Sequence, residues 1–157
     1  MVDSTDTVNL TDALVELSFL IQATLARLAG ERGLSLIQVR LLGILRDREP
    51  GIVELADVLR LEKSSVSGLV DRAQRRGLVE RAASKGTDGR AIRVVLTELG
   101  RRMASEFAEQ VSTEITELVE SFSRGQRRQL AALAARMVAS SGMADGLQAP
   151  REEQPEV

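Results

Sequence analysis

The stretch LEKSSVSGLVDRAQRRGLVER, residues 61–81, decides the fold. Its apolar residues recur at helical spacing and form one stripe, made of Val66, Leu69, Val70 and Ala73. The residues off that stripe are small, hydroxyl-bearing or charged: Lys63, Ser64, Ser65, Ser67, Asp71, Arg72 and Arg75. Gly77 predicts the end of the helix, because glycine readily adopts the left-handed conformation that closes a helix. The stretch therefore predicts an amphipathic helix followed by a strand.

The polar face of this helix suits the major groove of DNA. Serines allow close approach to the backbone and base edges, and arginines can pair with phosphate or guanine. Gly68 costs about 1 kcal/mol of helix stability relative to alanine, but it leaves room for DNA to approach. An ordinary amphipathic surface helix has the same pattern, so the helix alone leaves both interpretations open.

The residues before this helix predict a helix-turn-helix. Ser35 and Gln38 form a capping-box pattern at the start of a helix that ends near Asp47. A short helix over about 53–59 follows, and residues 60–62 form a tight connection into the helix described above. Two helices of an unrelated bundle would have the same pattern.

The residues after Gly77 discriminate between these alternatives. Residues 78–81 are strand-like, residues 82–89 predict a loop, and Ile92, Val94 and Leu96 alternate with other residues as in a half-buried strand. A β-hairpin directly after a recognition helix predicts a winged helix-turn-helix. Lys85 and Arg90 are the wing residues that could contact phosphates or enter the minor groove.

Long apolar helices flank this unit. Residues 9–29 predict one helix, and Thr97 caps a second, whose apolar spacing continues to Phe122. Ser123 and Gln126 repeat the capping-box pattern and start a last helix that ends by residue 142. The apolar surface exceeds what a monomer can cover, so we expect these helices to interlock with a second copy. An intramolecular bundle is the alternative.

The expected fold class is mainly α with a small β-hairpin wing: a winged helix-turn-helix with N- and C-terminal dimerisation helices. The expected organisation is a flexible N-terminus (1–8), a dimerisation helix (9–33), the DNA-binding winged domain (34–97), further dimerisation helices (98–141) and a disordered tail (142–157).

Composition excludes several classes of function. The 157 residues contain no cysteine and no histidine, which removes disulfides, thiol switches, serine–histidine triads and most transition-metal sites. No catalytic constellation is evident, since Lys63 beside Ser64 is better explained as a phosphate contact, and we expect no enzyme activity, cofactor or metal. With no signal-peptide pattern and no apolar run near the 18 or so residues of a membrane span, we expect a cytoplasmic protein and no membrane association.

The net charge of −2 is unevenly distributed. Residues 54–93 hold nine basic and six acidic side chains, whereas residues 1–53 and 94–157 are both net acidic. The positive charge thus lies in the predicted winged domain, where it would steer the protein toward phosphate.

Two motifs resemble the MarR family of bacterial winged-helix transcription regulators, and the resemblance spans about residues 10–140. The first is 61–81, with its acidic residue, Lys-Ser, alternating Val and Ser, Leu-Val-Asp-Arg and Gly-Leu-Val. The second is the wing motif D-x-R…V-x-L-T-x-x-G, which here begins at Asp88 and ends at Gly100.

The resemblance implies a homodimer that binds double-stranded DNA at a palindromic operator, with one recognition helix per half-site. The implied DNA contacts are Lys63, Ser64, Ser65, Ser67 and Arg72 in the helix and Arg90 in the wing, where Asp88 would steady the arginine. Gly68, Arg75 and Lys85 complete the expected DNA-binding set. The family also implies a repressor released by a small apolar or aromatic anion.

The chain departs from the family pattern at several positions. Gly68 replaces a larger polar residue, Ala73 a leucine and Ile52 a capping serine or threonine, and Lys85 and Thr87 stand where many members have another aspartate and arginine. Conceivable effector-wall residues are Leu17, Ile21, Val39, Arg40 and Met103, although each also suits the core, the dimer interface or a surface ion pair. The alternative function is a dimeric winged-helix scaffold that binds proteins and no operator.

Overall fold

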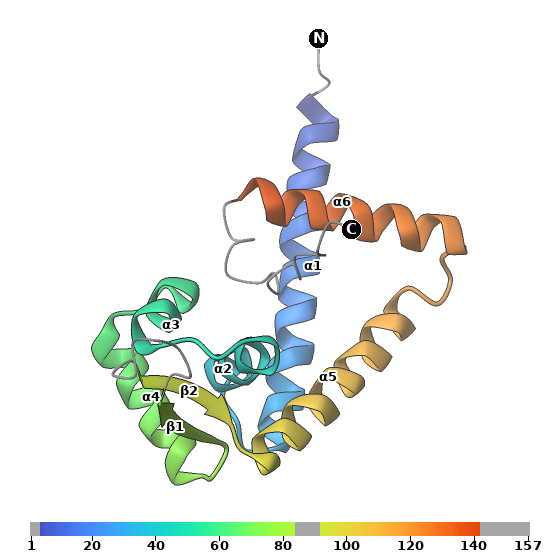
Figure 1. The fold of residues 1–157 in the computed structure, drawn as a ribbon. Helices are drawn as coiled ribbons and strands as arrows, with labels where there is room; N and C mark the ends of the chain where they lie inside the picture. Colours follow the sequence, from blue (N-terminus) through green and yellow to red (C-terminus); the bar gives the residue numbers. More distant parts are fainter. Residues whose placement is uncertain (1–3, 84–91, 142–157) are drawn as a thin grey trace, which may run out of the picture.

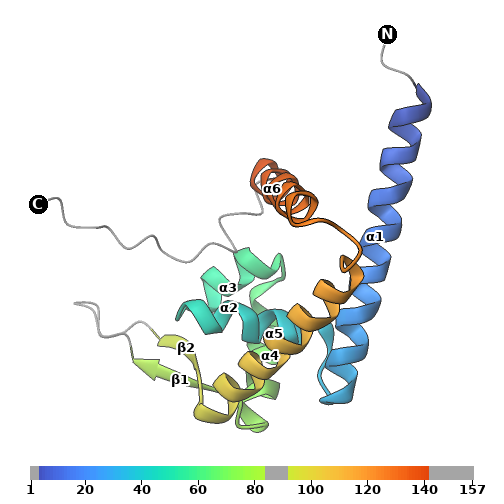
Figure 2. The same cartoon turned by 90° about the vertical axis from the view of Figure 1, so that its right-hand side faces the viewer.

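The computed structural model describes residues 4–83 and 92–141. Over these residues it has six helices and two antiparallel strands, which confirms the mainly α fold with a hairpin (Figures 1 and 2). In chain order the elements are α1 (Ser4–Glu31), α2 (Leu36–Asp47), α3 (Ile52–Leu59), α4 (Lys63–Arg75), β1 (Val79–Ala83), β2 (Ile92–Leu96), α5 (Glu98–Leu118) and α6 (Arg124–Ser140). The helices α2 to α4 and the hairpin form one unit, and α1, α5 and α6 extend away from it.

The first two helices of this unit begin with side-chain caps, a reciprocal one at α2 and a single hydrogen bond at α3. The Ser35 hydroxyl accepts a hydrogen bond from the Gln38 amide, and the Gln38 side chain accepts one from the Ser35 amide, so the predicted capping box is confirmed. At α3 the Glu54 carboxylate accepts the Gly51 amide at 2.7 Å. This helix therefore begins at Ile52, one residue before the expected start.

Helix α4, the expected recognition helix, ends as predicted. Gly77 has a φ of +69°, its amide donates to the carbonyl of Gln74, and the Leu78 amide donates to the carbonyl of Ala73. These two bonds form a Schellman motif, which satisfies the last carbonyls of the helix and turns the chain into β1.

The hairpin pairs Val79 with Leu96 and Ala83 with Ile92. β1 continues two residues beyond the expected end at Arg81, because the cross-strand pairing persists as far as Ala83. Val94 and Leu96 are buried as predicted, but Ile92 is 58% exposed. The expectation of an inward Ile92 is wrong, since this end of the strand projects beyond the core.

The first helix starts earlier than the sequence suggested. α1 begins at Ser4, whereas a start at Asn9 or Thr11 was expected. No glycine or proline interrupts residues 4–9, and once a helix has formed, each further residue adds a hydrogen bond at little cost.

The expectation that no apolar stretch reaches membrane-spanning length is also wrong. By length and composition alone, Asn9–Glu31 is long and apolar enough, with a mean hydropathy of 1.4 over its most apolar window. Polar residues such as serine, threonine and glutamine interrupt the apolar run in this segment, but the hydropathy averaged over the window remains high. A helix that buries its apolar faces against a second subunit passes the same test, so this finding does not by itself indicate a membrane span.

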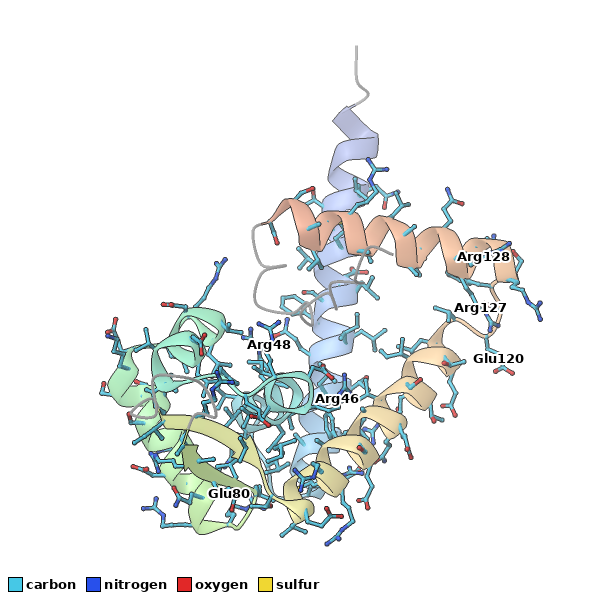
Figure 3. The ribbon with its side chains drawn as sticks, in the orientation of Figure 1. Arg46, Arg48, Glu80, Glu120, Arg127 and Arg128 are labelled. Atoms are coloured by element: carbon cyan, nitrogen blue, oxygen red, sulfur yellow. The ribbon has the colours of Figure 1, made fainter. Side chains whose placement is uncertain are left out.

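The long helix α5 ends at Leu118, before the expected end at Phe122. Arg127 fixes the following turn by donating to the carbonyls of Glu120 at 2.7 Å and Phe122 at 3.0 Å (Figure 3). Ser123 then starts α6 through the predicted capping box with Gln126, which is confirmed.

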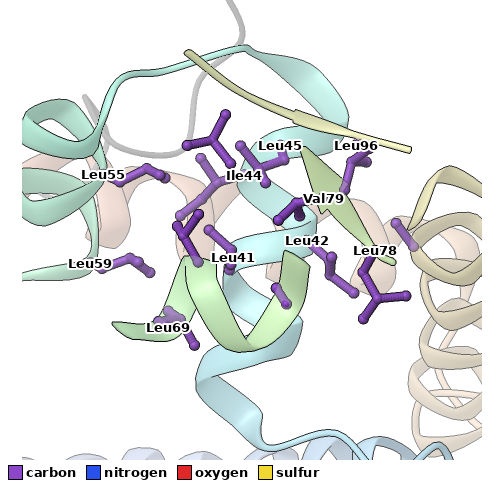
Figure 4. Packing of buried hydrophobic residues seen from close by; sticks show 14 of the residues in the cluster. Leu41, Leu42, Ile44, Leu45, Leu55, Leu59, Leu69, Leu78, Val79 and Leu96 are labelled. Atoms are coloured by element: carbon purple, nitrogen blue, oxygen red, sulfur yellow. The ribbon is translucent and has the colours of Figure 1, made fainter. Parts of the chain in front are cut away.

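One hydrophobic core joins the winged unit to the neighbouring ends of α1 and α5 (Figure 4). Its largest fully buried side chains are Leu28, Leu41, Leu55, Leu69, Leu78, Val66, Val70, Val79 and Val94. Helix α5 approaches this core so closely that a Cβ atom added at Gly100 would lie 1.9 Å from the Leu78 carbonyl oxygen. Glycine is therefore required there.

The far parts of α1, α5 and α6 lie outside this core. α6 has no buried residue, and Figure 2 shows it clear of α1, although the two overlap in Figure 1. These parts expose large apolar side chains: Leu10, Val15, Leu17, Phe19, Leu20, Leu118, Phe122, Leu130, Leu133, Met137 and Val138.

Candidate nucleic-acid interface

The candidate interface is the polar face of α4. The stripe Val66, Leu69, Val70 and Ala73 is buried, as the sequence predicted. The opposite face is open to solvent, and it carries Lys63, Ser64, Ser65, Arg72 and Arg75 as exposed residues. The core thus fixes the helix by one side and leaves a hydroxyl-bearing and basic surface on the other.

The N-terminal turn of α4 favours an anion. Lys63, Ser64 and Ser65 occupy its first three positions, and none of them is acidic. The exposed N-cap residue Glu62 is the nearest carboxylate in the chain, and its side chain makes no capping hydrogen bond with the first amides. The free amides of a first turn carry partial positive charge, so a lysine at this position is unfavourable for the isolated helix. A phosphate at this end would be attracted by both the amides and the lysine.

Two small residues occupy the middle of α4. Ser67 and Gly68 are half-buried. A Cβ atom added at Gly68 would lie 3.4 Å from the Arg72 guanidinium, so the glycine gives this arginine space over the helix surface. The expected approach of DNA at Gly68 stays a prediction, and in the structure the space over this glycine borders the Arg72 side chain.

The arginines of α4 differ in their partners. Within residues 4–83 and 92–141, no hydrogen bond or ion pair engages the side chains of Arg72 or Arg75. Asp71, which the sequence placed on the accessible face, pairs with Arg81 of β1 at 2.7 Å. Among the described residues, Arg72 and Arg75 are therefore exposed cations without an ion-pair partner.

Arg60 is a candidate contact that sequence reasoning missed. It is exposed in the turn between α3 and α4, with a φ of +53°, which is uncommon for a residue other than glycine. The turn is closed by hydrogen bonds from the Arg60 and Leu61 amides to the carbonyls of Asp57 and Ala56. An arginine at a position that favours glycine points to a role for its side chain, and its place beside the start of α4 suits a phosphate contact.

The wing-tip residues Lys85, Asp88 and Arg90 lie outside the described residues. The base of the wing is described, and it carries the exposed Arg93 on β2. The hairpin is joined to α4 by Thr97, whose hydroxyl donates to the Gly77 carbonyl at 2.6 Å and accepts the Gly100 amide at 3.0 Å. One side chain thus connects the end of the recognition helix, the end of β2 and the start of α5.

A largely apolar pocket of about 180 Å³ lies between α2 and α5, separate from the α4 face. It is lined by Leu34, Val39, Leu42, Gly43, Arg46, Ala104, Phe107, Ala108 and Val111. Of the five conceivable effector-wall residues, only Val39 lines this pocket.

Arg46 supplies the charged group in the lining of this pocket (Figure 3). It donates two hydrogen bonds to Asp47, which raise the pKa of Arg46 against the opposing effect of burial. The guanidinium therefore remains a cation at the pocket. Among the described residues, no three His, Cys, Asp or Glu side chains cluster to hold a metal ion.

Comparisons with known proteins agree with this geometry. Residues 32–91 match the model of the MarR family. The structure is similar to that of RV1404 from Mycobacterium tuberculosis, with 26% identity, a TM-score of 0.73, and coverage of 90% of this chain and 97% of that one. A MarR family protein from Bacillus stearothermophilus has 22% identity, a TM-score of 0.75, and coverage of 88% and 99%.

A third similar structure is MepR, a transcription regulator of the Staphylococcus aureus multidrug efflux pump MepA. It has 19% identity, a TM-score of 0.69, and coverage of 83% of this chain and 96% of that one. No curated protein sequence matches the chain.

Proposed function

We propose that the chain is a MarR-family winged-helix protein, because residues 32–91 match the model of that family and the structure is similar to those described above. On this basis it is a DNA-binding transcription regulator that acts as a homodimeric repressor. It would read a palindromic operator with one α4 helix per half-site. Such a function places the protein in the cytoplasm, in contact with double-stranded DNA.

The observation that carries this proposal is the exposed polar face of α4. Its first turn offers free amides beside Lys63, and its later turns offer Arg72 and Arg75, whose side chains have no ion-pair partner among the residues that the structure describes. Phosphate contacts of this kind supply most of the affinity for DNA, whereas side chains that reach base edges supply the sequence preference. Ser67 and Arg72, beside the opening at Gly68, are the proposed base-reading residues.

The apolar surface of α1 and α6 supports a dimer. Phe19 on α1 is 65% exposed, and Met137 on α6 is 54% exposed. Large apolar side chains exposed on helices outside the core favour an interaction site on each of these helices, and a second copy supplies a self-complementary partner. Two winged units held one helical turn apart would match successive major grooves on one side of the duplex.

The pocket between α2 and α5 is the proposed effector site. Its apolar lining with one arginine suits a small apolar or aromatic anion, which would release the repressor by binding one dimer arrangement more tightly than the other. The pocket lies between the winged unit and α5, where such a molecule could alter their relative position.

Footprinting tests the proposal on DNA from the region upstream of the gene. We expect a protected segment with two-fold symmetry and half-site centres about 10 base pairs apart. The same protein should sediment as a dimer. Uniform digestion of the upstream region at protein concentrations that retain a dimer would contradict the operator-reading function and favour the protein-binding scaffold.

A further inference from the structure

One arginine ties the end of the recognition helix to the turn between α1 and α2. Arg76 follows α4 directly, and its guanidinium donates to the carbonyls of Gly33 at 2.5 Å and Arg32 at 3.2 Å. Gly33 has a φ of +62°, and this left-handed conformation turns the carbonyls toward Arg76. The tie joins the DNA-reading element to a turn 43 residues earlier in the chain.

The same turn is held from its other side by α5. The Arg32 guanidinium donates to the Gln110 side chain at 2.5 Å and lies 5.7 Å from the centroid of the Phe107 ring. A further bond to the Leu28 carbonyl fixes it to the end of α1. Arg32 therefore links α5 to the turn whose carbonyls hold Arg76.

The residues on both sides of this turn line the α2–α5 pocket. Phe107 lies beneath the Arg32 guanidinium, and Leu34 follows Gly33 directly in the chain; both line the pocket. Leu34 and Phe107 are also buried members of the core. Because a close-packed core transmits a displacement instead of absorbing it, a shift of either side chain moves the turn.

We propose that Arg76 is a positioning residue that couples the α2–α5 pocket to the recognition helix. The inference rests on the proposed function, since it identifies how the proposed effector site would regulate the DNA-binding face. A molecule in the pocket displaces Leu34 and Phe107, the turn at Arg32 and Gly33 follows, and Arg76 carries the end of α4 with it. The orientation of α4 then depends on the pocket through this tie.

A side chain built into the pocket can replace the unidentified effector. Gly43 lies on the same face of α2 as Val39 and Arg46, and a Cβ atom added there meets no atom within 4 Å. Gly43→Leu fills the pocket from α2. Gly43→Ala is the matched control, because it removes the backbone flexibility of glycine but fills little of the pocket.

Two spin labels report the position of α4 relative to α5. The chain has no cysteine, so Ser65→Cys on α4 and Ser105→Cys on α5 can be labelled selectively. Labelled chains diluted in an excess of unlabelled protein give the distance within one chain, whether the protein is a monomer or a dimer. The distance distribution is measured by double electron–electron resonance without DNA.

The coupling predicts a shift that depends on Arg76. Gly43→Leu should shift the label distance by a few ångströms relative to Gly43→Ala when Arg76 is present. In Arg76→Ala the same filling should leave the distance unchanged, and Arg76→Lys, which retains a donor, should restore part of the shift. An equal shift with and without Arg76, or no shift with Arg76 present, would overturn the proposal.

A second filling variant guards against misfolding. If Gly43→Leu does not fold, Ala108→Leu fills the same pocket from α5, and the same outcomes apply. Since no DNA is present, a failure of this coupling and a failure to bind an operator are measured separately.

Discussion

The guanidinium of Arg81 in β1 lies 2.7 Å from the carboxylate of Asp71 in α4, and it also donates to the side chain of Gln74 one turn further along that helix. The first strand of the wing is therefore attached to the recognition helix by side chains as well as by the chain itself. The attachment engages the acidic residue of α4, and among the described residues Arg72 and Arg75 have no ion-pair partner.

Removing the contact between Arg81 and Asp71 should lower the free energy of unfolding by a small but measurable amount. We expect Arg81→Ala to lower the free energy of unfolding by about 0.5 to 1 kcal/mol, because the ion pair is partly exposed and screened by water. Urea denaturation of Arg81→Ala, Asp71→Ala and the double variant measures it. The two losses should overlap in the double variant, and strictly additive losses would show that the pair contributes nothing.

Gly100 should tolerate no larger residue. Gly100→Ala would place a Cβ atom 1.9 Å from the Leu78 carbonyl oxygen, so α5 must shift away from the core. We expect a loss of about 3 kcal/mol or more in the free energy of unfolding. Gly125→Ala is the matched control, since its nearest neighbour, the Ser123 hydroxyl, is 3.9 Å away. Similar small effects at both positions would contradict the close approach of α5.

Arg60 should affect stability and DNA binding in opposite directions. Arg60→Gly should raise the free energy of unfolding by about 1 kcal/mol, because glycine adopts the left-handed conformation at φ +53° without strain. Arg60→Ala removes the same cation but keeps the strain. Thermal denaturation and DNA titration of both variants separate the effects: both should bind DNA more weakly than the unaltered protein, and only the glycine variant should be more stable. Unchanged DNA affinity in both would exclude the proposed phosphate contact.

The wing and the recognition helix should contribute differently to DNA binding. We propose that Arg90→Ala weakens binding to every duplex and reduces the dependence on salt, as expected for a phosphate or minor-groove contact. Arg72→Ala should in addition change which bases are preferred at the half-site, by about 1 to 3 kcal/mol at that position. Titrations against a set of single-base operator variants measure both effects. Arg90→Ala that binds DNA like the unaltered protein would show that the wing assignment is wrong.

Local patterns were sufficient to predict the DNA-binding unit. The stripe on α4, the stop at Gly77 and the capping boxes at Ser35 and Ser123 depend on residues within one or two turns of each other, and the structure confirms them. The two strands were equally predictable, because alternation and an intervening loop specify a hairpin.

Interactions between distant residues could not be predicted in this way. The tie from Arg76 to Gly33 and the pair of Arg81 with Asp71 depend on how the helices pack, which single-sequence periodicity does not report. The same applies to the glycine required at position 100. The α2–α5 pocket was not predicted either: the sequence left the effector site open, and of the five conceivable wall residues only Val39 lines this pocket.

Fluorescence anisotropy tests the central claim most directly, with a labelled duplex from the region upstream of the gene and a scrambled duplex of equal composition. Each is titrated at about 50 mM and 200 mM salt. A dimer that neutralises about six phosphates should lose roughly 1,000-fold in affinity between these concentrations and should prefer the upstream duplex at both. Equal, weak binding to the two duplexes, with little change between the salt concentrations, would contradict an operator-reading regulator.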